Sequence, residues 1–310
     1  MPGGAAVGVA LSTQGVLVVG VSDVAGKSPA QSAGLRAGDL IEAVNGQALR
    51  GSQHLTELIA ASGGQPLQIA YRRNGAPRTA TLTPLWDGGA GAYRMGAWVR
   101  DSTAGVGTLS YYNPSDGTYG ALGHAINDAD TGRLLPVKTG ALLQADIVDV
   151  NKGRKGAPGE LWGSFLRSRQ TLGDIGENTA LGIYGHLSAP YVNPLYPQGL
   201  PMGYQESVEI GPAVILSTVG GQEIREYSVE IIQANRQAVP AQKSMILRVT
   251  DPELLERTGG IVQGMSGSPI LQDGKLVGAV THVFLSDPKR GYGISIRDML
   301  DDALILDEAA

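Results

Sequence analysis

Hydrophobic and polar residues alternate over short stretches along most of this chain, and turn-forming residues separate the stretches. Glycine, proline and asparagine divide the sequence into short apolar runs at 106–112, 140–150, 180–187, 213–218, 227–234 and 243–249. Short apolar runs at this spacing are typical of β-barrels and β-sandwiches. Apolar residues recur at helical spacing at 52–61 and again at 296–306. We therefore predict a mainly β fold with few helices.

The first 86 residues carry a denser pattern of elements. A strand at 16–19 precedes a short helix at 28–35, in which Ser28 can cap the first turn and Pro29 takes the first helical position. A strand, a helix and two further strands complete the pattern at 37–46, 52–61, 67–72 and 78–83. We take residues 1–86 as the first domain.

This order of elements, with the stretch SPAQSAGLRAGDLIEAVNG at residues 28–46, resembles a bacterial-type PDZ domain. The resemblance implies a groove between the strand at 16–19 and the helix at 52–61, where a peptide adds as an extra strand. The groove residues would be Gly15, Val16, Leu17 and Val18, with backbone N–H groups near 14–16 holding a carboxylate. The alternative is a packing module without a ligand.

A glycine-rich linker is predicted at 87–97, and the second domain at 98–310. The β pattern continues through this second domain. The stretch 189–209 contains four prolines and is predicted to be a long loop near a binding face.

Composition and charge exclude several classes of function. The formal charge of −5 argues against nucleic acid or an acidic membrane as the main partner. The chain has no cysteine, so disulfides and thiolate chemistry are excluded, and its four histidines lack the HExxH spacing of a zinc site. We expect no metal and no cofactor. The start of the chain does not look like a signal peptide, so we expect a cytoplasmic protein or a trimmed form.

The most informative motif is GMSGSP at residues 264–269, which places Ser266 between two glycines. It precedes a predicted hairpin at 270–280 with its turn at 273–274. Glycines let the backbone turn sharply, so that the N–H groups of Gly264 and Ser266 can stabilise an oxyanion while the serine attacks a carbonyl. This arrangement is the one that a trypsin-like protease uses.

A serine nucleophile needs a base, and that base needs an orienting acid. We favour His124, which follows a glycine-rich approach at 119–123, over His54, His186 and His282. His54 is interpreted as a surface or groove residue, and a structural role is predicted for His282. For the acid we favour Asp251, where a strand ends before a proline, over Asp128, Asp130 and Asp146.

These residues match one family. The stretches 15–20, 98–109, 120–124, 264–269 and 278–284 resemble those of the SpoIVB peptidases, sporulation proteins of spore-forming Firmicutes. The resemblance implies a PDZ domain followed by a chymotrypsin/trypsin-like double β-barrel. It also implies a catalytic triad of His124, Asp251 and Ser266, in the order found in chymotrypsin.

The same resemblance implies a role in sporulation signalling. The peptidase would act outside the cytoplasm, in the space between forespore and mother cell, although the export segment of the family is missing from this sequence. Its substrate would be a membrane-bound regulator of an intramembrane protease, whose release activates a late mother-cell sigma factor. Self-cleavage and a peptide ligand for the PDZ domain are implied as well.

Two other classes of function compete with a serine endopeptidase. The first is a non-catalytic binding or regulatory protein, in which the PDZ groove is the working site and the protease fold is a scaffold. The second is an α/β-hydrolase esterase, which the sequence disfavours because Ser268 stands where the GxSxG motif needs glycine.

Overall fold

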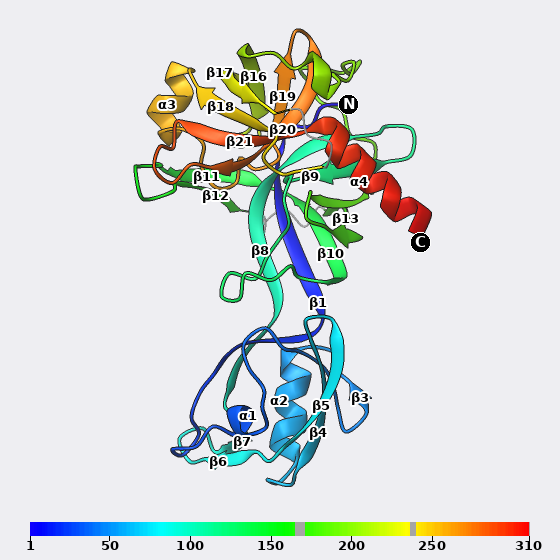
Figure 1. Ribbon diagram of the computed structural model, residues 1–310, viewed down its shortest axis with the longest axis vertical. Coiled ribbons are helices and arrows are strands. Elements are labelled where there is room, and N and C mark those ends of the chain that lie inside the picture. The colour runs from blue at the N-terminus through cyan, green and yellow to red at the C-terminus, as the bar shows by residue number, and fades with distance from the viewer. Residues whose placement is uncertain (165–170, 236–239, 310) are drawn as a thin grey trace. The chain divides into compact units, whose positions relative to one another are not determined.

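The computed structural model describes residues 1–164, 171–235 and 240–309. The chain forms two compact units (Figure 1). Unit 1 comprises Met1–Leu11, Ala104–Ile126 and Thr139–Ala310, and unit 2 comprises Ser12–Thr103 and Asn127–Lys138.

These units do not follow the predicted boundaries of 1–86 and 98–310. Two strands of 16 residues, β1 (Ala6–Val21) and β8 (Ala97–Tyr112), each belong partly to unit 1 and partly to unit 2. The chain returns to unit 2 for residues 127–138, between two segments of unit 1. The two units are thus made of several chain segments each, and the predicted domain bounds stay a prediction.

Unit 2 is a small sheet with a helix packed on it. Its strands follow the order β1, β2, β4 and β5, and β3 pairs with β2. The buried core combines apolar residues of these strands with Leu55 and Ile59 of the longer helix. The elements are β2 (Leu40–Val44), β3 (Gln47–Ala48), β4 (Leu67–Arg73), β5 (Ala76–Leu82), α1 (Pro29–Ser32) and α2 (Ser52–Ala61).

The predicted helix at 28–35 is present as the shorter α1. The Ser28 hydroxyl caps it by accepting a bond from the N–H of Gln31, and Pro29 is its first residue. Gly34 has a φ of +79°, which ends the helix.

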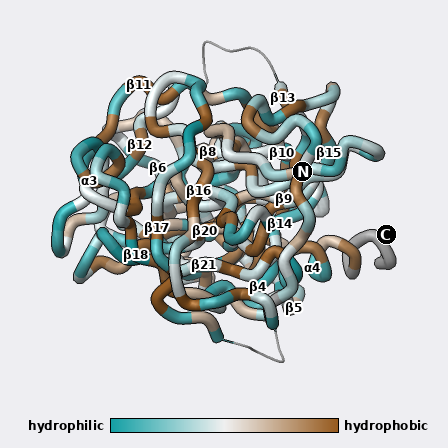
Figure 2. The backbone as a smooth tube through the Cα atoms, turned by 90° about the horizontal axis from the view of Figure 1, so that it is seen from above, coloured by the Kyte–Doolittle hydropathy of each residue, from teal (hydrophilic) through white to brown (hydrophobic). Residues whose placement is uncertain are grey.

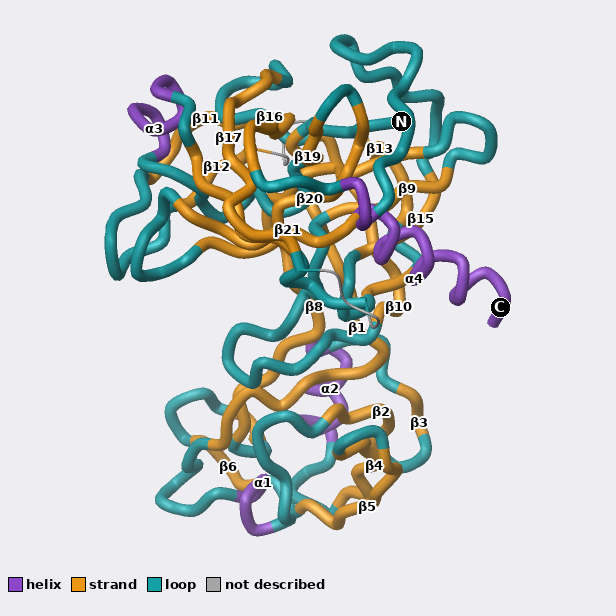
Figure 3. Tube along the Cα trace, turned by 45° about the horizontal axis from the view of Figure 1, so that its top comes forward, coloured by secondary structure: helices purple, strands orange, loops and turns teal. Residues whose placement is uncertain are grey.

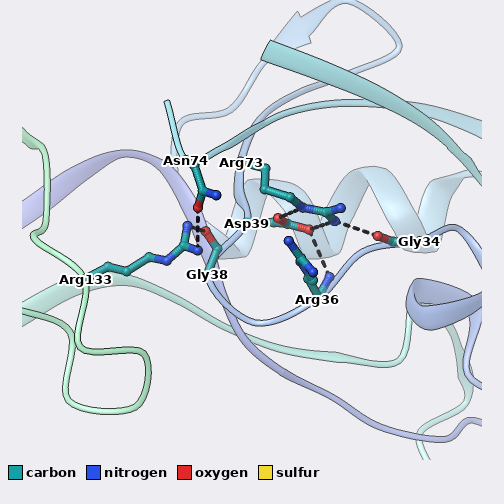
Figure 4. Close-up of polar contacts among 7 residues, drawn as sticks. All are labelled: Gly34, Arg36, Gly38, Asp39, Arg73, Asn74 and Arg133. Atoms are coloured by element: carbon teal, nitrogen blue, oxygen red, sulfur yellow. Dashed lines mark hydrogen bonds and ion pairs between the residues drawn. The ribbon is translucent and has the colours of Figure 1, made fainter. Parts of the chain in front are cut away.

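An ion pair fixes the loop that follows α1 to strand β4. Asp39 is fully buried, and its carboxylate accepts bonds from the Arg73 guanidinium at 2.7 Å and from the N–H of Arg36 at 2.9 Å. Arg73 also donates to the carbonyl of Gly34 at 2.6 Å (Figure 4). The GD pair of the PDZ-like motif therefore has a structural purpose, since Asp39 joins two elements of the unit.

The predicted linker at 87–97 is not a free linker. Strands β6 (Leu85–Asp87) and β7 (Ala92–Arg94) form a hairpin whose turn holds the glycines. The rings of Trp86 and Tyr93 meet edge to face, with centroids 5.3 Å apart. A cross-strand aromatic pair of this kind stabilises a hairpin that composition alone does not reveal.

Unit 1 contains a closed barrel and part of an open sheet. The barrel has the order β16–β17–β18–β21–β20–β19, and the open sheet joins β14, β15, β9 and β8 to β1. Of the double barrel that the resemblance implies, one barrel is closed among the described residues and the other set of strands stays open. The mainly β prediction is confirmed.

The elements of unit 1 are mostly short strands. They are β9 (Thr118–Ala121), β10 (Val137–Gln144), β11 (Asp146–Asn151), β12 (Glu160–Ser164), β13 (Thr171–Asp174), β14 (Glu177–Asn178), β15 (Ile183–His186), β16 (Gly211–Ser217), β17 (Arg225–Ala234), β18 (Met245–Val249), β19 (Pro269–Gln272), β20 (Lys275–Val283) and β21 (Arg290–Ser295), with η1 (Gln205–Ser207), α3 (Pro252–Thr258) and α4 (Ile296–Ala309).

The barrel is filled by the side chains that alternate along its strands. Strand β17 alternates buried and exposed positions along most of its length, and hydrophobic and hydrophilic residues accordingly alternate along the tube in Figure 2. Strands predominate in this unit, and α3 and α4 lie at its periphery (Figure 3). The barrel therefore provides a rigid frame for the loops between its strands.

Candidate active site

Ser266 lies in a turn that two glycines make possible. Gly264 and Gly267 have φ angles of +97° and +95°, in a region that residues with a side chain rarely adopt. A Cβ atom on Gly267 would lie 2.6 Å from the backbone nitrogen of Leu122 and would also overlap the carbonyl of Thr108. The backbone segments pack so closely here that only glycine fits.

Two strands hold this turn in place. The Ser266 hydroxyl donates to the carbonyl of Thr281 in β20 at 2.6 Å. On the other side, Thr108 of β8 donates from its N–H to the Ser266 carbonyl and from its hydroxyl to the Gly264 carbonyl, both at 2.9 Å. The turn is therefore rigid, and the hydroxyl must rotate away from Thr281 before it can reach a base.

The turn presents unused backbone donors. Within the described residues, the N–H groups of Gly264 and Ser266 donate to no protein acceptor, whereas those of Met265 and Gly267 bond to carbonyls at 3.1 and 2.7 Å. Unused donors beside a nucleophile are what an oxyanion hole needs. This pattern supports the predicted use of Gly264 and Ser266.

His124 is presented as a neutral base. Leu122 and Gly123 before it both have a φ of +69°, which turns the chain after β9. The Nδ1 atom of His124 lies 2.8 Å from the carbonyl oxygen of Ala125, and because a carbonyl only accepts, Nδ1 carries the proton and Nε2 is the basic nitrogen. Burial lowers the pKa of His124, and the bond to Ala125 opposes this shift without cancelling it. The ring is therefore neutral at pH 7.

Thr281 is the common neighbour of the predicted nucleophile and the predicted base. Its carbonyl accepts the Ser266 hydroxyl, and its methyl group lies 3.0 Å from the point where a Cβ of Gly123 would stand. The ring of the next residue, His282, lies against the ring of His124, with centroids 4.8 Å apart. Ser266 and the segment of His124 therefore both contact the same stretch of β20, at Thr281 and His282.

His282 packs against the proposed base His124, a contact that the sequence did not predict. Burial, followed by the nearby His124 and Lys243, lowers the pKa of His282 to about 4. Its Nδ1 atom is buried and has no hydrogen-bond partner in the described part of the chain. The sequence places His282 directly after Thr281, but only the folded chain shows that its ring lies against His124.

Asp251 lies at the start of α3, where it acts as the N-cap. Its carboxylate accepts bonds from the N–H of Leu254 at 2.9 Å and from the N–H of Ser228 at 3.3 Å. The Nδ1 atom of His124 is bonded to Ala125 instead. The orienting role of Asp251 therefore stays a prediction, and the structure gives its carboxylate a second explanation as a helix cap.

The other candidates have structural partners. His54 is buried rather than exposed. Its Nδ1 accepts the N–H of Arg50 at 3.2 Å and thereby ties α2 to the preceding loop. Asp128 and Asp130 both pair with Arg100, at 2.6 and 2.8 Å. Among the described residues, no cluster of three or more potential ligands could hold a metal ion.

The predicted peptide groove is arranged differently in unit 2. Strand β1, which contains Gly15, Val16, Leu17 and Val18, pairs with β2, β8 and β10. Val16 and Val18 are fully buried in the core. Their place in a peptide groove stays a prediction.

Strand β7 lies beside helix α2, and the first part of β8 meets the start of the helix. Asp101 accepts the N–H of Ser52 at 2.7 Å at the start of the helix, and Tyr93 packs against Gly64 beyond its end. Ala97 and Val99 are half-buried and pack on the core of the unit. A strand edge beside a helix is the kind of place where a peptide binds by strand addition.

A PDZ-like unit and a closed β-barrel in one chain are the two parts of a peptidase with a PDZ domain. The family of SpoIVB peptidase S55 matches residues 91–300, and the PDZ domain family matches residues 20–73. Because the first match covers most of the chain, the protein belongs to the SpoIVB peptidase S55 family.

Individual relatives are more distant. The zinc metalloprotease RasP of Geobacillus kaustophilus is 26% identical over 158 residues, which are 42% of this chain and 38% of that protein. The chain thus spans about two fifths of the length of this relative. No helix among the described residues is both long and apolar enough to cross a bilayer.

Three solved structures illustrate the likeness. The PDZ domain of the SdrC-like protein of Listeria monocytogenes is 26% identical, covers 29% of this chain and 90% of its own, and has a TM-score of 0.25. The active form of the Rv3671c protease of M. tuberculosis is 15% identical. The match covers 65% of this chain and 74% of that protease chain, with a TM-score of 0.36. The HtrA-type protease AlgW with a decapeptide is 10% identical. The match covers 69% of this chain and 54% of the AlgW chain, with a TM-score of 0.39.

Proposed function

We propose that this chain is a serine endopeptidase in which Ser266 is the nucleophile and His124 the general base. The observation that carries the proposal is the glycine turn at 264–267, which leaves two N–H groups unused beside a serine and shares Thr281 with the base segment. Membership of a peptidase family supports the same conclusion.

The chemistry follows from these positions. The Ser266 hydroxyl turns from Thr281 toward Nε2 of His124, which takes its proton as Oγ bonds to the peptide carbonyl carbon. The N–H groups of Gly264 and Ser266 bind the oxyanion. The C–N bond then breaks, the amine leaves with the proton from His124, and water hydrolyses the acyl ester by the same proton transfers in reverse order. Asp251 is proposed as the group that orients His124 on the strength of the family resemblance alone.

We also propose that the peptide-binding edge of the PDZ unit is the first part of β8. A peptide would add along Ala97–Asp101, facing α2, and bury its apolar side chains against Ala97, Val99 and Leu58. The support is the half-buried state of these three residues and the absence, within the described residues, of any second strand partner for this part of β8.

The biological role is proposed from the family. Family resemblance favours sporulation signalling outside the cytoplasm, with a membrane-anchored regulatory protein as the substrate and this chain as a second, self-cleaved substrate. The resemblance rests on stretches at 98–109, 120–124 and 264–269, all of which lie within the family match.

The activity can be tested without knowledge of the natural substrate. Purified wild-type protein and the variants Ser266→Ala and His124→Ala are incubated with fluorescein-labelled casein, and the release of fluorescent peptides is followed. We expect release by the wild type alone. Release by Ser266→Ala at the wild-type rate would refute the proposal. A folded wild type that releases nothing and reacts with no serine-directed probe would favour the alternative, a non-catalytic PDZ-containing binding protein.

A further inference from the structure

The carbonyl that holds the proposed base belongs to a peptide group whose other end is held by a buried side chain. Nδ1 of His124 donates to the Ala125 carbonyl at 2.8 Å. The same peptide group carries the N–H of Ile126, which donates to Oδ1 of Asn178 at 2.8 Å. This peptide group is planar and trans, so its C=O and N–H bonds point in opposite directions. Asn178, the peptide group and His124 therefore form one chain of hydrogen bonds along residues 124–126, which we call the base segment.

A second bond fixes the orientation of the Asn178 amide. Its Nδ2 donates to the carbonyl of Ile126 at 2.8 Å, while its Oδ1 accepts the N–H of the same residue. Because an N–H only donates and a carbonyl only accepts, the amide fits in this orientation alone. The two groups belong to the peptide units before and after Ile126. The amide therefore fixes the rotation of both units, including the one that holds His124.

Asn178 lies on the sheet that leads to the base. It is the second residue of β14, where it pairs with Ile183 of β15, and Ile183 pairs in turn with Ala121 of β9. Ile183 and Ala121 are fully buried, and Asn178 is 7% exposed. Strand β9 ends three residues before His124. Neighbouring strands of one sheet, all within unit 1, thus carry the amide and the base.

The turn after Asn178 is also anchored. The hydroxyl of Thr179 donates to the carboxylate of Asp302 in α4 at 2.6 Å. The N–H of Thr179 donates to the carbonyl of Gly182 at 2.9 Å, which closes the turn between β14 and β15. The position of Asn178 is therefore set by the hairpin and by α4, independently of the base segment that it holds.

This chain of bonds does what a general base needs. A neutral imidazole carries one proton, and Nε2 can accept the serine proton only while Nδ1 holds the ring's own. The Ala125 carbonyl selects that tautomer. Burial lowers the pKa of His124 and the bond to Ala125 raises it, so the same bond stabilises the imidazolium that forms during the reaction. Asp251 could take the Nδ1 proton only in place of Ala125.

We infer that Asn178 is a positioning residue, which sets the tautomer and the direction of His124 through the peptide group between Ala125 and Ile126. Asn178 touches neither the substrate nor the reacting atoms, and it acts only through the base segment. The inference rests on the proposed function, because the tautomer of His124 matters for catalysis only if His124 is the base. It deepens that proposal by naming the side chain that keeps the base in its working form.

The test compares two substitutions of Asn178 with a matched control. Asn178→Leu has nearly the same shape and loses both bonds, whereas Asn178→Asp keeps an oxygen for the N–H of Ile126. The control is Asn193→Leu. Asn193 is also a buried amide of unit 1 that holds backbone, since it donates to the Pro2 carbonyl at 3.1 Å and accepts the N–H of Leu195 at 2.8 Å. Among the described residues, its bonds do not include the base segment.

The first measurement is the tautomer of His124, which does not depend on activity. The whole chain is labelled with ¹⁵N-histidine, and two-bond ¹⁵N–¹H spectra recorded at about pH 8 are assigned with the help of His124→Ala. We expect the proton on Nδ1 in the wild type, in Asn178→Asp and in Asn193→Leu. Asn178→Leu should show Nε2–H instead of, or mixed with, Nδ1–H. A purely structural role for Asn178 would leave the tautomer unchanged in every folded variant.

The second measurement is the second-order rate constant for labelling by a fluorophosphonate probe. We expect Asn178→Leu to be labelled roughly tenfold to a hundredfold more slowly, since a displacement of about 1 Å can cost that much. Asn178→Asp should be labelled close to the wild-type rate because it still accepts the N–H of Ile126. Asn193→Leu should lose stability but stay within about twofold of the wild-type rate, because distant sites act independently.

The two measurements separate the inference from the proposed function. If the folded wild type is not labelled, the proposed function fails, whatever the tautomer of His124. A labelled wild type whose His124 carries its proton on Nε2 overturns the inference, as does a folded Asn178→Leu that keeps the wild-type tautomer or the wild-type rate. If circular dichroism shows that Asn178→Leu does not fold, Asn178→Ala takes its place and is judged by the same two results.

Discussion

Gly267 offers a direct test of why the nucleophile turn requires glycine, and Gly274 serves as its matched control. Both residues have positive φ angles, +95° and +70°. A Cβ on Gly274 would meet no atom within 4 Å, whereas a Cβ on Gly267 would overlap the Thr108 carbonyl and lie 2.6 Å from the Leu122 nitrogen. The two substitutions to alanine therefore share the backbone strain and differ in the steric clash.

The expected losses of stability follow from the backbone strain and the steric clash. A left-handed conformation costs an alanine about 1–2 kcal/mol, and the smaller entropy of its unfolded chain returns about 0.4–1 kcal/mol. Gly274→Ala should therefore destabilise unit 1 by ~1 kcal/mol. Gly267→Ala should lose a further ~1–3 kcal/mol, because the clashing atoms belong to the backbone and cannot rotate away.

Differential scanning calorimetry on the whole chain measures both changes. For a unit of roughly 200 residues, each kcal/mol lowers the Tm by about 2–4 °C, so we expect a drop of about 2–4 °C for Gly274→Ala and of about 5–15 °C for Gly267→Ala. Fluorophosphonate labelling should persist in the first variant and be lost in the second. Equal Tm shifts in the two variants would refute the close-packing argument.

Four other predictions use different parts of the molecule. Burial lowers the pKa of His124, so the base stays neutral as the pH falls through about 6.5; casein cleavage should decline only below that pH, and a midpoint at or above it would contradict the burial argument. Asp251→Ser should keep the Tm within about 2 °C because serine also caps α3, whereas Asp251→Ala should cost about 1 kcal/mol; labelling lost in folded Asp251→Ser would support the orienting role, and retained labelling would leave orientation to Ala125. Asp39→Ala leaves Arg73 without its buried partner and should cost unit 2 about 3–5 kcal/mol in denaturant unfolding, while no loss would show that the pair is dispensable. Val99→Asp should abolish binding of peptides selected by phage display against the wild type. It should leave casein cleavage by the whole chain unchanged. Undiminished peptide binding would place the groove elsewhere.

The sequence predicted the structure best where a residue type favours one backbone conformation. The glycines around Ser266 indicated a tight turn, and the positive φ angles at Gly264 and Gly267 agree. Ser28 and Pro29 indicated the start of α1, although the helix is shorter than expected. Alternating apolar runs indicated strands, and the run at 227–234 lies within β17.

The sequence was less informative where a residue has two possible uses. Asp251 before a proline was interpreted as a strand end with a catalytic acid, yet the same pair is also a helix start signal, and α3 begins there. The glycines of 87–97 suggested a linker because the contact between Trp86 and Tyr93 is not visible in a local pattern. The packing of His282 against His124 depends on the barrel as a whole.

The two compact units differ from the predicted domain bounds for a related reason. Strand β8 is one unbroken strand of 16 residues, and no turn marks the point between Thr103 and Ala104 where it passes from unit 2 to unit 1. The peptide edge was predicted at 15–18 from the PDZ resemblance, and the pairing of β1 with β8, more than 70 residues away in the sequence, is not visible in that local pattern.

The most direct test of the central claim is the intact mass of the whole chain after reaction with a fluorophosphonate, followed by peptide mapping. The account predicts one adduct per chain, located on Ser266, and none in Ser266→Ala or His124→Ala. A folded wild type without an adduct, or an adduct on any other residue that persists in Ser266→Ala, would contradict it.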